Sequence, residues 1–249
     1  MMALKFESNI KPGRPFINYA HRGASEYVPE NTMLAFSLGI TMGANGIETD
    51  VQKSKDGVLI LFHDDTLDRV TGQTGAISDY TLKELKSFSV NKNGILDKIV
   101  TLEEFLIAFA KKKIHFAIEL KSAGFGKEVV DMIKRYNAQN YSVITSFDYD
   151  ALKEVKNYDA TIRLGYLTWQ IDDELLAKMK DDGFYEICPR DDFVTKENVK
   201  LWHELGFNVR AWNIKNEDIM KRVYDNGADG MTVNFPDKLV DYIASKIST

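Results

Sequence analysis

The chain contains four histidines, and two of them lie beside charged residues in short motifs. His21 precedes Arg22, and His63 precedes Asp64. A single histidine in such a place is more often a structural loop residue. Two histidines near an arginine and several carboxylates are more typical of acid–base chemistry, because histidine titrates near neutral pH and a pair supplies both an acid and a base. We therefore interpret His21 and His63 as the catalytic pair.

Three carboxylates occur in strand-like segments. Glu48 and Asp50 are two residues apart, and Glu119 lies two residues before Lys121. Since alternate residues of a strand share a face, each pair points one way. Clustered carboxylates repel one another unless a cation offsets them, and all-oxygen ligands favour one divalent cation, Mg²⁺ or Ca²⁺, over zinc. Spacing alone is equally compatible with an ion-pair network formed by Arg22 and Lys121. The nearby histidines favour the metal.

The neighbouring cations indicate phosphoryl chemistry. The planar guanidinium of Arg22 matches the oxygens of a phosphate. Together with Lys121, a divalent cation and two histidines, it describes a site for a phosphate ester. Among the aromatic residues near predicted strand ends, we expect Trp212 to face the substrate. The others could wall the pocket or equally pack at its rim: Phe147, Trp169 and Phe235.

Three further residues of reactive types are interpreted as structural. His115 precedes a predicted strand and so lies opposite the site, and His203 lies within a predicted helix. Cys188 has no neighbour in the sequence that would activate its thiol, so we expect a buried, unreactive side chain.

The scaffold must bring distant strand ends together. Short apolar runs alternate with amphipathic helical patterns, and several runs are continuously apolar, as in parallel strands covered on both faces. The expected strands are residues 16–20, 46–51, 116–120, 142–145, 162–166, 185–188, 208–212 and 230–233. The expected helices are residues 31–42, the helix that begins at the 101–104 capping box, 127–136, 149–155, 173–181, 196–205, 216–224 and 237–246. This alternation predicts an α/β fold, a (β/α)8 TIM barrel with its active face at the strand carboxyl ends.

One segment interrupts the alternation. Residues 58–62 indicate an extra strand after the hairpin signal Asp56-Gly57, and residues 64–98 are long for a barrel loop. We expect one domain over residues 1–249, with a small inserted subdomain at about 64–98 after the second strand region that walls part of the pocket. The competing fold is an open doubly wound sheet, but the Gly-rich phosphate motif typical after its first strand is missing.

Composition narrows the set of partners. The net charge of −5 and the pI of about 5.5 argue against a surface that binds nucleic acid or anionic lipid through charge. The single cysteine excludes an internal disulfide. No apolar run approaches the roughly 18 residues of a membrane span, and residues 1–7 form no apolar leader. We expect a cytoplasmic protein with a small-molecule substrate, no nucleic-acid partner and no stable membrane association. The oligomeric state is left open.

Seven motifs, taken in chain order, resemble those of the glycerophosphodiester phosphodiesterase family. They are His21-Arg22-Gly23, Pro29-Glu30-Asn31-Thr32, Glu48-Thr49-Asp50, His63-Asp64, Glu119-Leu120-Lys121, Val209-Arg210-Ala211-Trp212 and Gly227-Ala228-Asp229-Gly230. The resemblance runs from Ile17 to Lys238 in the family's order and spacing. It implies a barrel with a subdomain inserted after His63.

The resemblance also implies an activity: metal-dependent hydrolysis of glycerophosphodiesters, such as glycerophosphocholine or glycerophosphoethanolamine, to glycerol 3-phosphate and an alcohol. The resemblance implies that the metal ligands are Glu48, Asp50 and Glu119. It implies that His21 and His63 form the acid–base pair, and that Arg22 and Lys121 bind the phosphodiester. No Ser, Thr or Cys in the motifs has a histidine positioned to activate it, so we expect a cyclic 1,2-phosphate intermediate rather than a covalent phosphoenzyme.

Two alternative functions are weighed against this one. A related barrel acting on lysophospholipids or phosphoinositides would need a membrane-docking surface, and no such cluster stands out. A catalytically inactive barrel would be expected to lack a histidine or a carboxylate, and all five are present.

The chain departs from the family pattern at two places. Val233-Asn234 stands where the family carries Thr-Asp, and Val100 replaces a proline that often precedes the helix cap. Glu30 and Asn31 are expected to shape the mouth of the site, with a helix N-cap as the alternative role of Asn31.

Overall fold

Eight parallel strands form a closed barrel in the computed structural model, which describes residues 16–247. Residues 1–7, on which the expectation of no leader rests, lie outside the described residues. The barrel strands are β1 (Ile17–His21), β2 (Gly46–Lys53), β7 (His115–Leu120), β8 (Ser142–Ser146), β9 (Arg163–Thr168), β10 (Glu186–Pro189), β11 (Asn208–Ile214) and β12 (Gly230–Val233). The barrel closes because β1 pairs in parallel with both β2 and β12.

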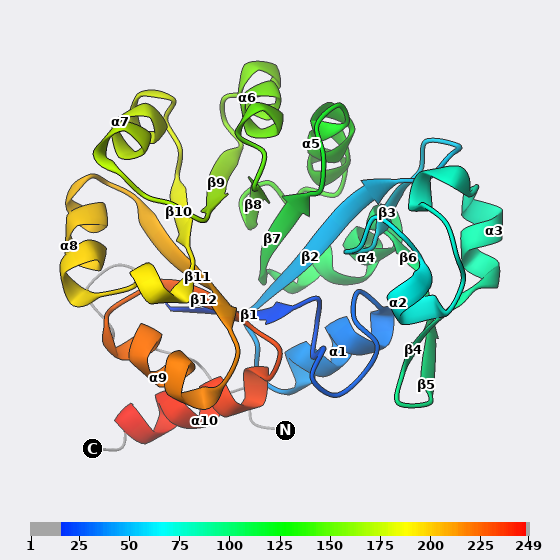
Figure 1. Cartoon of the computed structure of the whole chain (residues 1–249), viewed down its shortest axis with the longest axis horizontal. Coiled ribbons are helices and arrows are strands. Elements are labelled where there is room, and N and C mark those ends of the chain that lie inside the picture. Colours follow the sequence, from blue (N-terminus) through cyan, green and yellow to red (C-terminus); the bar gives the residue numbers. More distant parts are fainter. Residues whose placement is uncertain (1–15, 248–249) are drawn as a thin grey trace.

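Helices surround the barrel and follow its strands in sequence (Figure 1). They are α1 (Met33–Thr41), α4 (Leu102–Phe109), α5 (Gly126–Arg135), α6 (Tyr149–Tyr158), α7 (Asp173–Asp181), α8 (Lys196–Glu204), α9 (Glu217–Asp225) and α10 (Pro236–Ile247). The (β/α)8 prediction is confirmed, and the open-sheet alternative is wrong because β1 pairs with both β2 and β12, which closes the sheet.

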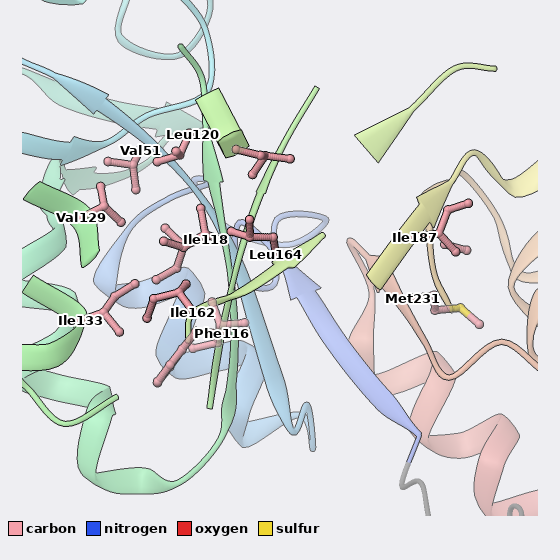
Figure 2. Close-up of a cluster of buried hydrophobic side chains, with 14 of the residues drawn as sticks. Val51, Phe116, Ile118, Leu120, Val129, Ile133, Ile162, Leu164, Ile187 and Met231 are labelled. Atoms are coloured by element: carbon pink, nitrogen blue, oxygen red, sulfur yellow. The ribbon is translucent and has the colours of Figure 1, made fainter. Parts of the chain in front are cut away.

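Most of the core lies between strands and helices. Figure 2 shows Phe116 and Ile118 of β7 beside Val129 and Ile133 of α5. All four are fully buried, and burying such a side chain stabilises the fold by about 1.5–3 kcal/mol. Successive strand residues point to opposite faces. The side chains that alternate with Phe116 and Ile118, such as Glu119, therefore point into the barrel.

The interior of the barrel becomes more polar toward the strand carboxyl ends. A small apolar cluster that includes Ile17 and Tyr19 occupies its amino-terminal part. Arg210 and Glu186 follow as a fully buried ion pair, with Arg210 Nε 2.8 Å from Glu186 Oε2. Cys188 is buried beside this pair, as expected. Polar side chains at the next level therefore face the open end of the barrel.

The chain between β2 and α4 forms additional structure. Its elements are β3 (Leu59–Leu61), α2 (Asp68–Thr71), a 3₁₀ turn (Ile77–Asp79), α3 (Leu82–Ser87), β4 (Ser89–Lys92), β5 (Ile95–Lys98) and β6 (Val100–Thr101). They lie to one side of the barrel, near α1 (Figure 1). They share a separate apolar cluster: Ile60, Phe62, Leu67, Val70, Ile77, Leu85, Val90 and Ile99. The division into a barrel and an inserted subdomain stays a prediction.

Helix capping differs from expectation at one site. The Thr101 capping box forms as predicted, with reciprocal bonds to Glu104 of 3.1 and 2.8 Å. At α1, however, the N-cap is Thr32, whose Oγ1 accepts a hydrogen bond from the N–H of Ala35 at 3.2 Å. The capping role considered for Asn31 is therefore wrong. Across residues 16–247, no helix is both long and apolar enough to span a membrane.

Candidate active site

Strand register brings four of the predicted residues to adjacent positions. His21 of β1 lies opposite Glu48 of β2, and Asp50 of β2 lies opposite Glu119 of β7. The carboxylates of Glu48, Asp50 and Glu119 all have a ligand atom within 4.8 Å of the others, and all three residues are buried. The two-residue spacing in β2 thus produces the cluster expected from the sequence.

His63 reaches the same place through the β2–β3 hairpin. β2 continues beyond the barrel, and β3 returns antiparallel to it. The backbone N–H of Phe62 then donates a hydrogen bond to the carbonyl of Asp50 at 3.0 Å. This bond returns the chain to the level of the carboxylates, and His63 lines the same cavity as His21.

Two cations contact the carboxylate cluster. Lys121 Nζ lies 2.8 Å from Glu119 Oε1 and 3.6 Å from Asp50 Oδ1. Arg22 Nε lies 3.2 Å from Asp50 Oδ2. The ion-pair network considered from the sequence is therefore present, and it is centred on Asp50.

The electrostatics of the cluster are uneven. Burial and the other carboxylates raise the pKa of Glu48 well above its ordinary value, and burial together with Asp50 raises that of Glu119. Burial alone would also raise the pKa of Asp50, but Arg22 and Lys121 hold it well below its usual range. The two cations thus offset mainly one of the three carboxylates.

These residues fit a divalent cation. All ligand atoms are carboxylate oxygens, the donor set that Mg²⁺ and Ca²⁺ prefer. Asp50 Oδ1 is buried and has no hydrogen-bond partner in the part of the chain described. Such an atom is costly to bury, and coordination of a cation would satisfy it.

His21 is held by a neutral partner. Its Nδ1 lies 2.6 Å from Oδ1 of Asn234, which also accepts a hydrogen bond from Ser25 Oγ at 3.1 Å. The other ring nitrogen, Nε2, lies 3.8 Å from Glu48 Oε2. Burial and the Arg22 guanidinium lower the pKa of His21 to about 3. The ring is therefore neutral at neutral pH, with Nε2 facing the carboxylates.

His63 is held by a charged partner. Its Nδ1 lies 2.7 Å from Asp64 Oδ1. Arg69 donates hydrogen bonds from Nε and Nη2 to the two oxygens of the same carboxylate. Partial burial opposes ionisation of Asp64, but the bonds from Arg69 and His63 lower its pKa to about 2. An ionised Asp64 thus orients the His63 ring.

The loop after β1 presents Arg22 in a constrained backbone conformation. Arg22 has a φ of 55°, and its N–H donates to the carbonyl of Glu48 at 3.0 Å. Gly23 follows with a φ of 84°, and a Cβ there would lie 2.4 Å from the carbonyl carbon of Ala35. Only glycine fits this close approach. Asn31, which we expected at the mouth, instead lies within the buried network and donates to Asp50 Oδ2 at 2.9 Å.

A cavity of about 440 Å³ has an ionic side, lined by His21, Arg22, Glu48, His63 and Glu119, and an aromatic side. Trp212 lines it, and so do Phe147 and Trp169, whose sequence positions were compatible with either a pocket wall or rim packing. The ring centroids of Phe147 and Trp169 are 5.4 Å apart, and those of Trp169 and Trp212 are 4.5 Å apart. Phe235 is buried and is not among the described lining residues.

Several contributing residues were not assigned a role from the sequence. From the sequence, Asn234 stands out only as a departure from the family pattern, and nothing distinguishes Arg69. The pairing of Asn234 with His21 joins residues 213 positions apart, so only the barrel topology reveals it. None of the described lining residues comes from 64–98, so the expectation that this segment walls the pocket is wrong.

The two remaining histidines lie apart from the cavity. His115 begins β7, at the end of the strand opposite Glu119. His203 lies in α8, with Nε2 2.7 Å from Asp229 Oδ2. Neither is among the described lining residues, in agreement with their interpretation as structural.

The sequence and the fold were compared with known proteins. The model of the glycerophosphoryl diester phosphodiesterase family matches residues 21–238. A glycerophosphodiester phosphodiesterase from Bacillus altitudinis is 32% identical over 89% of this chain and 96% of its own. A glycerophosphodiester phosphodiesterase from Caldanaerobacter subterraneus subsp. tengcongensis is 30% identical, and the match covers 90% of this chain and 96% of that one.

Solved structures share the architecture. A phosphodiesterase from Oleispira antarctica, solved in complex with the product sn-glycerol-3-phosphate, superposes with a TM-score of 0.85. It is 27% identical, and the match covers 93% of this chain and 97% of that one.

Proposed function

The chain belongs to the glycerophosphoryl diester phosphodiesterase family, and we propose that it hydrolyses glycerophosphodiesters to glycerol 3-phosphate and an alcohol. The observation that carries the proposal is the meeting of two histidines, three carboxylates and two cations at one barrel mouth. The glycerol 3-phosphate complex of the Oleispira antarctica phosphodiesterase supports the choice of product.

We propose Glu48, Asp50 and Glu119 as the ligands of one divalent cation, Mg²⁺ or Ca²⁺. Their all-oxygen donor set supports this assignment, and so does Asp50 Oδ1, a buried atom that accepts no hydrogen bond among the described residues. When bound, such a cation supplies positive charge that stabilises the charge developing on the phosphoryl oxygens. Arg22 and Lys121, which already lie beside these carboxylates, would hold the phosphodiester from the same side.

His21 and His63 would serve as the acid–base pair. One histidine takes the proton of the substrate's glycerol 2-hydroxyl as that oxygen attacks phosphorus. The other protonates the departing alcohol, and a cyclic 1,2-phosphate is left. The roles then reverse: the first histidine returns its proton to the 2-oxygen while the second takes a proton from attacking water. Attack from within the substrate gains the advantage of an intramolecular reaction.

A covalent phosphoenzyme is less compatible with the site. Thr232 is the hydroxyl residue among the described lining residues, and its Oγ1 donates to the carbonyl of Ala211 at 3.2 Å. No histidine within residues 16–247 lies within hydrogen-bond distance of Thr232 to activate it as a nucleophile. This supports attack by the substrate's own hydroxyl.

The test is a 2-deoxy analogue of glycerophosphocholine. We expect the wild-type enzyme to hydrolyse glycerophosphocholine in the presence of Mg²⁺ or Ca²⁺ and to turn over the analogue negligibly. Phosphorus NMR during turnover of the natural substrate should reveal the cyclic phosphate. Hydrolysis of the analogue at a rate near that of the natural substrate would refute the cyclic route. Absence of turnover for every glycerophosphodiester tested would refute the function itself.

A further inference from the structure

Arg69 lies in α2, within residues 64–98, none of which is among the described residues that line the cavity. Its guanidinium nevertheless binds two carboxylates at once. Nε and Nη2 donate to Asp64 at 2.5 and 3.0 Å. Nη1 and Nη2 donate to Glu30 at 2.8 and 2.7 Å. A guanidinium has the planar fork that permits such paired hydrogen bonds.

Each of these carboxylates continues to a residue of the proposed active site. Asp64 Oδ1 lies 2.7 Å from Nδ1 of His63. Glu30 Oε1 accepts a hydrogen bond from Arg22 Nη1 at 3.0 Å. Arg69 is therefore the shared junction of two arms, one leading to a catalytic histidine and the other to a phosphate-binding arginine.

We propose that Arg69 is a positioning residue that fixes His63 and Arg22 relative to each other across the cavity. The proposal rests on the proposed function. Without Arg69, Asp64 would keep only its contact with His63, and the largely buried Glu30 would compete more strongly with substrate for Arg22. Misplacing a reacting group by about 1 Å can cost about 100-fold in rate.

The charges around this junction favour a role in geometry over a role in stability. The Arg69 side chain is 49% exposed, whereas those of Asp64 and Glu30 are 24% and 17% exposed. Isolated ion pairs of such an exposed residue contribute little to stability, whereas the paired bonds of this network hold its members in fixed positions. The network nevertheless joins three separate parts of the chain: the loop after β1, the residues after β3, and α2. The segment 64–98 thus influences catalysis through this arginine rather than by enclosing the substrate.

The experiment separates the two arms. We expect Arg69→Ala to lower kcat about 10–100-fold and to raise KM. Asp64→Asn should lower kcat with little change in KM, because it weakens only the arm to His63. Glu30→Gln should mainly raise KM, because an uncharged amide orients the Arg22 guanidinium less firmly than the carboxylate does. Tm should stay within about 5 °C of wild type in each variant.

A double-mutant cycle identifies the route of the effect. In a His63→Ala background, Arg69→Ala should cause little further loss of kcat, since the residue on which it acts is gone. Arg69→Lys should keep Tm near that of the wild type but should not restore kcat, because a single ammonium cannot hold both carboxylates in place. Arg163→Ala is the matched control: its guanidinium lies at the start of β9, near the ring of Tyr185, and its loss should leave kcat and KM unchanged.

A readout independent of turnover comes from NMR. The Nδ1 proton of His63, shared with Asp64, should give a downfield resonance in the wild type that shifts or broadens in Arg69→Ala and Arg69→Lys. If the wild type is active and Arg69→Ala keeps kcat and KM within twofold of the wild-type values, this proposal is overturned and the proposed function stays intact. Full recovery of kcat by Arg69→Lys, or an additive double-mutant cycle, would overturn it equally.

Discussion

The two sides of the cavity are held together in different ways. On the side formed by β1, β2 and β7, charged groups contact one another; Asp50, for example, accepts a hydrogen bond from Asn31 and faces both Arg22 and Lys121. On the opposite side, three aromatic rings pack against one another: Phe147 and Trp169 directly follow β8 and β9, and Trp212 lies within β11. Trp169 is 56% exposed.

This difference indicates what each side must supply. The interaction of charges in a poorly solvated site changes steeply with distance, so groups that act on phosphorus must be fixed from several directions. An aromatic wall needs only to offer apolar surface of suitable shape. Substitutions on the ionic side should therefore act mainly on kcat, and those on the aromatic side mainly on KM and on the choice of substrate.

The carboxylates should give the largest effect and the strictest test of the ionic side. Asp50→Asn or Glu119→Gln should lower kcat by about 10³-fold or more, because several kcal/mol of charge stabilisation depends on the cation they hold. Chelation by EDTA should abolish turnover in the same way. The control is Glu197→Gln, at an exposed position of α8. Its kcat should match that of the wild type.

Melting curves test cation binding at the same site without measuring turnover. A cation present at 100 times its Kd adds about 2.7 kcal/mol of stability, so Tm should rise on adding Mg²⁺ or Ca²⁺ to EDTA-treated protein, and this rise should vanish in Asp50→Asn. Full activity after complete removal of divalent ions would contradict the assignment of Glu48, Asp50 and Glu119 as ligands.

The histidines should give the next largest effect. His21→Ala and His63→Ala should each lower kcat about 10²–10⁴-fold with the fold intact, the range for lost general acid–base catalysis. His115→Ala and His203→Ala are matched controls. They should leave kcat nearly unchanged, although loss of the His203 contact with Asp229 should lower Tm. A His63→Ala enzyme with wild-type kcat would remove that residue from the mechanism.

Much of the ionic side could be predicted because it follows from strand periodicity. The two-residue spacing of Glu48 and Asp50, and the position of Glu119 in the next barrel strand, fix their shared face once parallel pairing is assumed. His21 follows from the same reasoning at the end of β1. Apolar runs of strand length and helix caps such as Thr101 sufficed to identify the barrel.

The remaining contacts depend on information that residue types do not carry. Asn234 reaches His21 only because the last strand pairs with the first. Arg69 resembles any surface arginine until the loop after β1 brings Glu30 within 2.7 Å. The cap of α1 is Thr32 rather than Asn31, a difference of one residue that depends on the positive φ of Asn31.

The aromatic side should give the smallest effect, and Trp169 is its most informative residue. Its centroid lies 4.5 Å from that of Trp212 and 5.4 Å from that of Phe147, so the rings touch one another and form a wall instead of an open cage around a cation. Arg190 lies 5.9 Å from the Trp169 ring centroid and adds positive charge nearby. The leaving alcohol would therefore gain mainly apolar contact here.

Trp169→Ala should raise KM about 2–10-fold with kcat unchanged, since a ring contact contributes about 0.5–1.5 kcal/mol. The rise should be larger for a glycerophosphodiester with a bulky apolar alcohol than for glycerophosphoethanolamine, because only the larger group reaches the wall. Tyr158→Ala removes a comparably exposed aromatic ring on α6 and should change neither constant. If Trp169→Ala instead lowered kcat equally for all substrates, the aromatic side would share the positioning role of the ionic side, and the contrast between the two would fail.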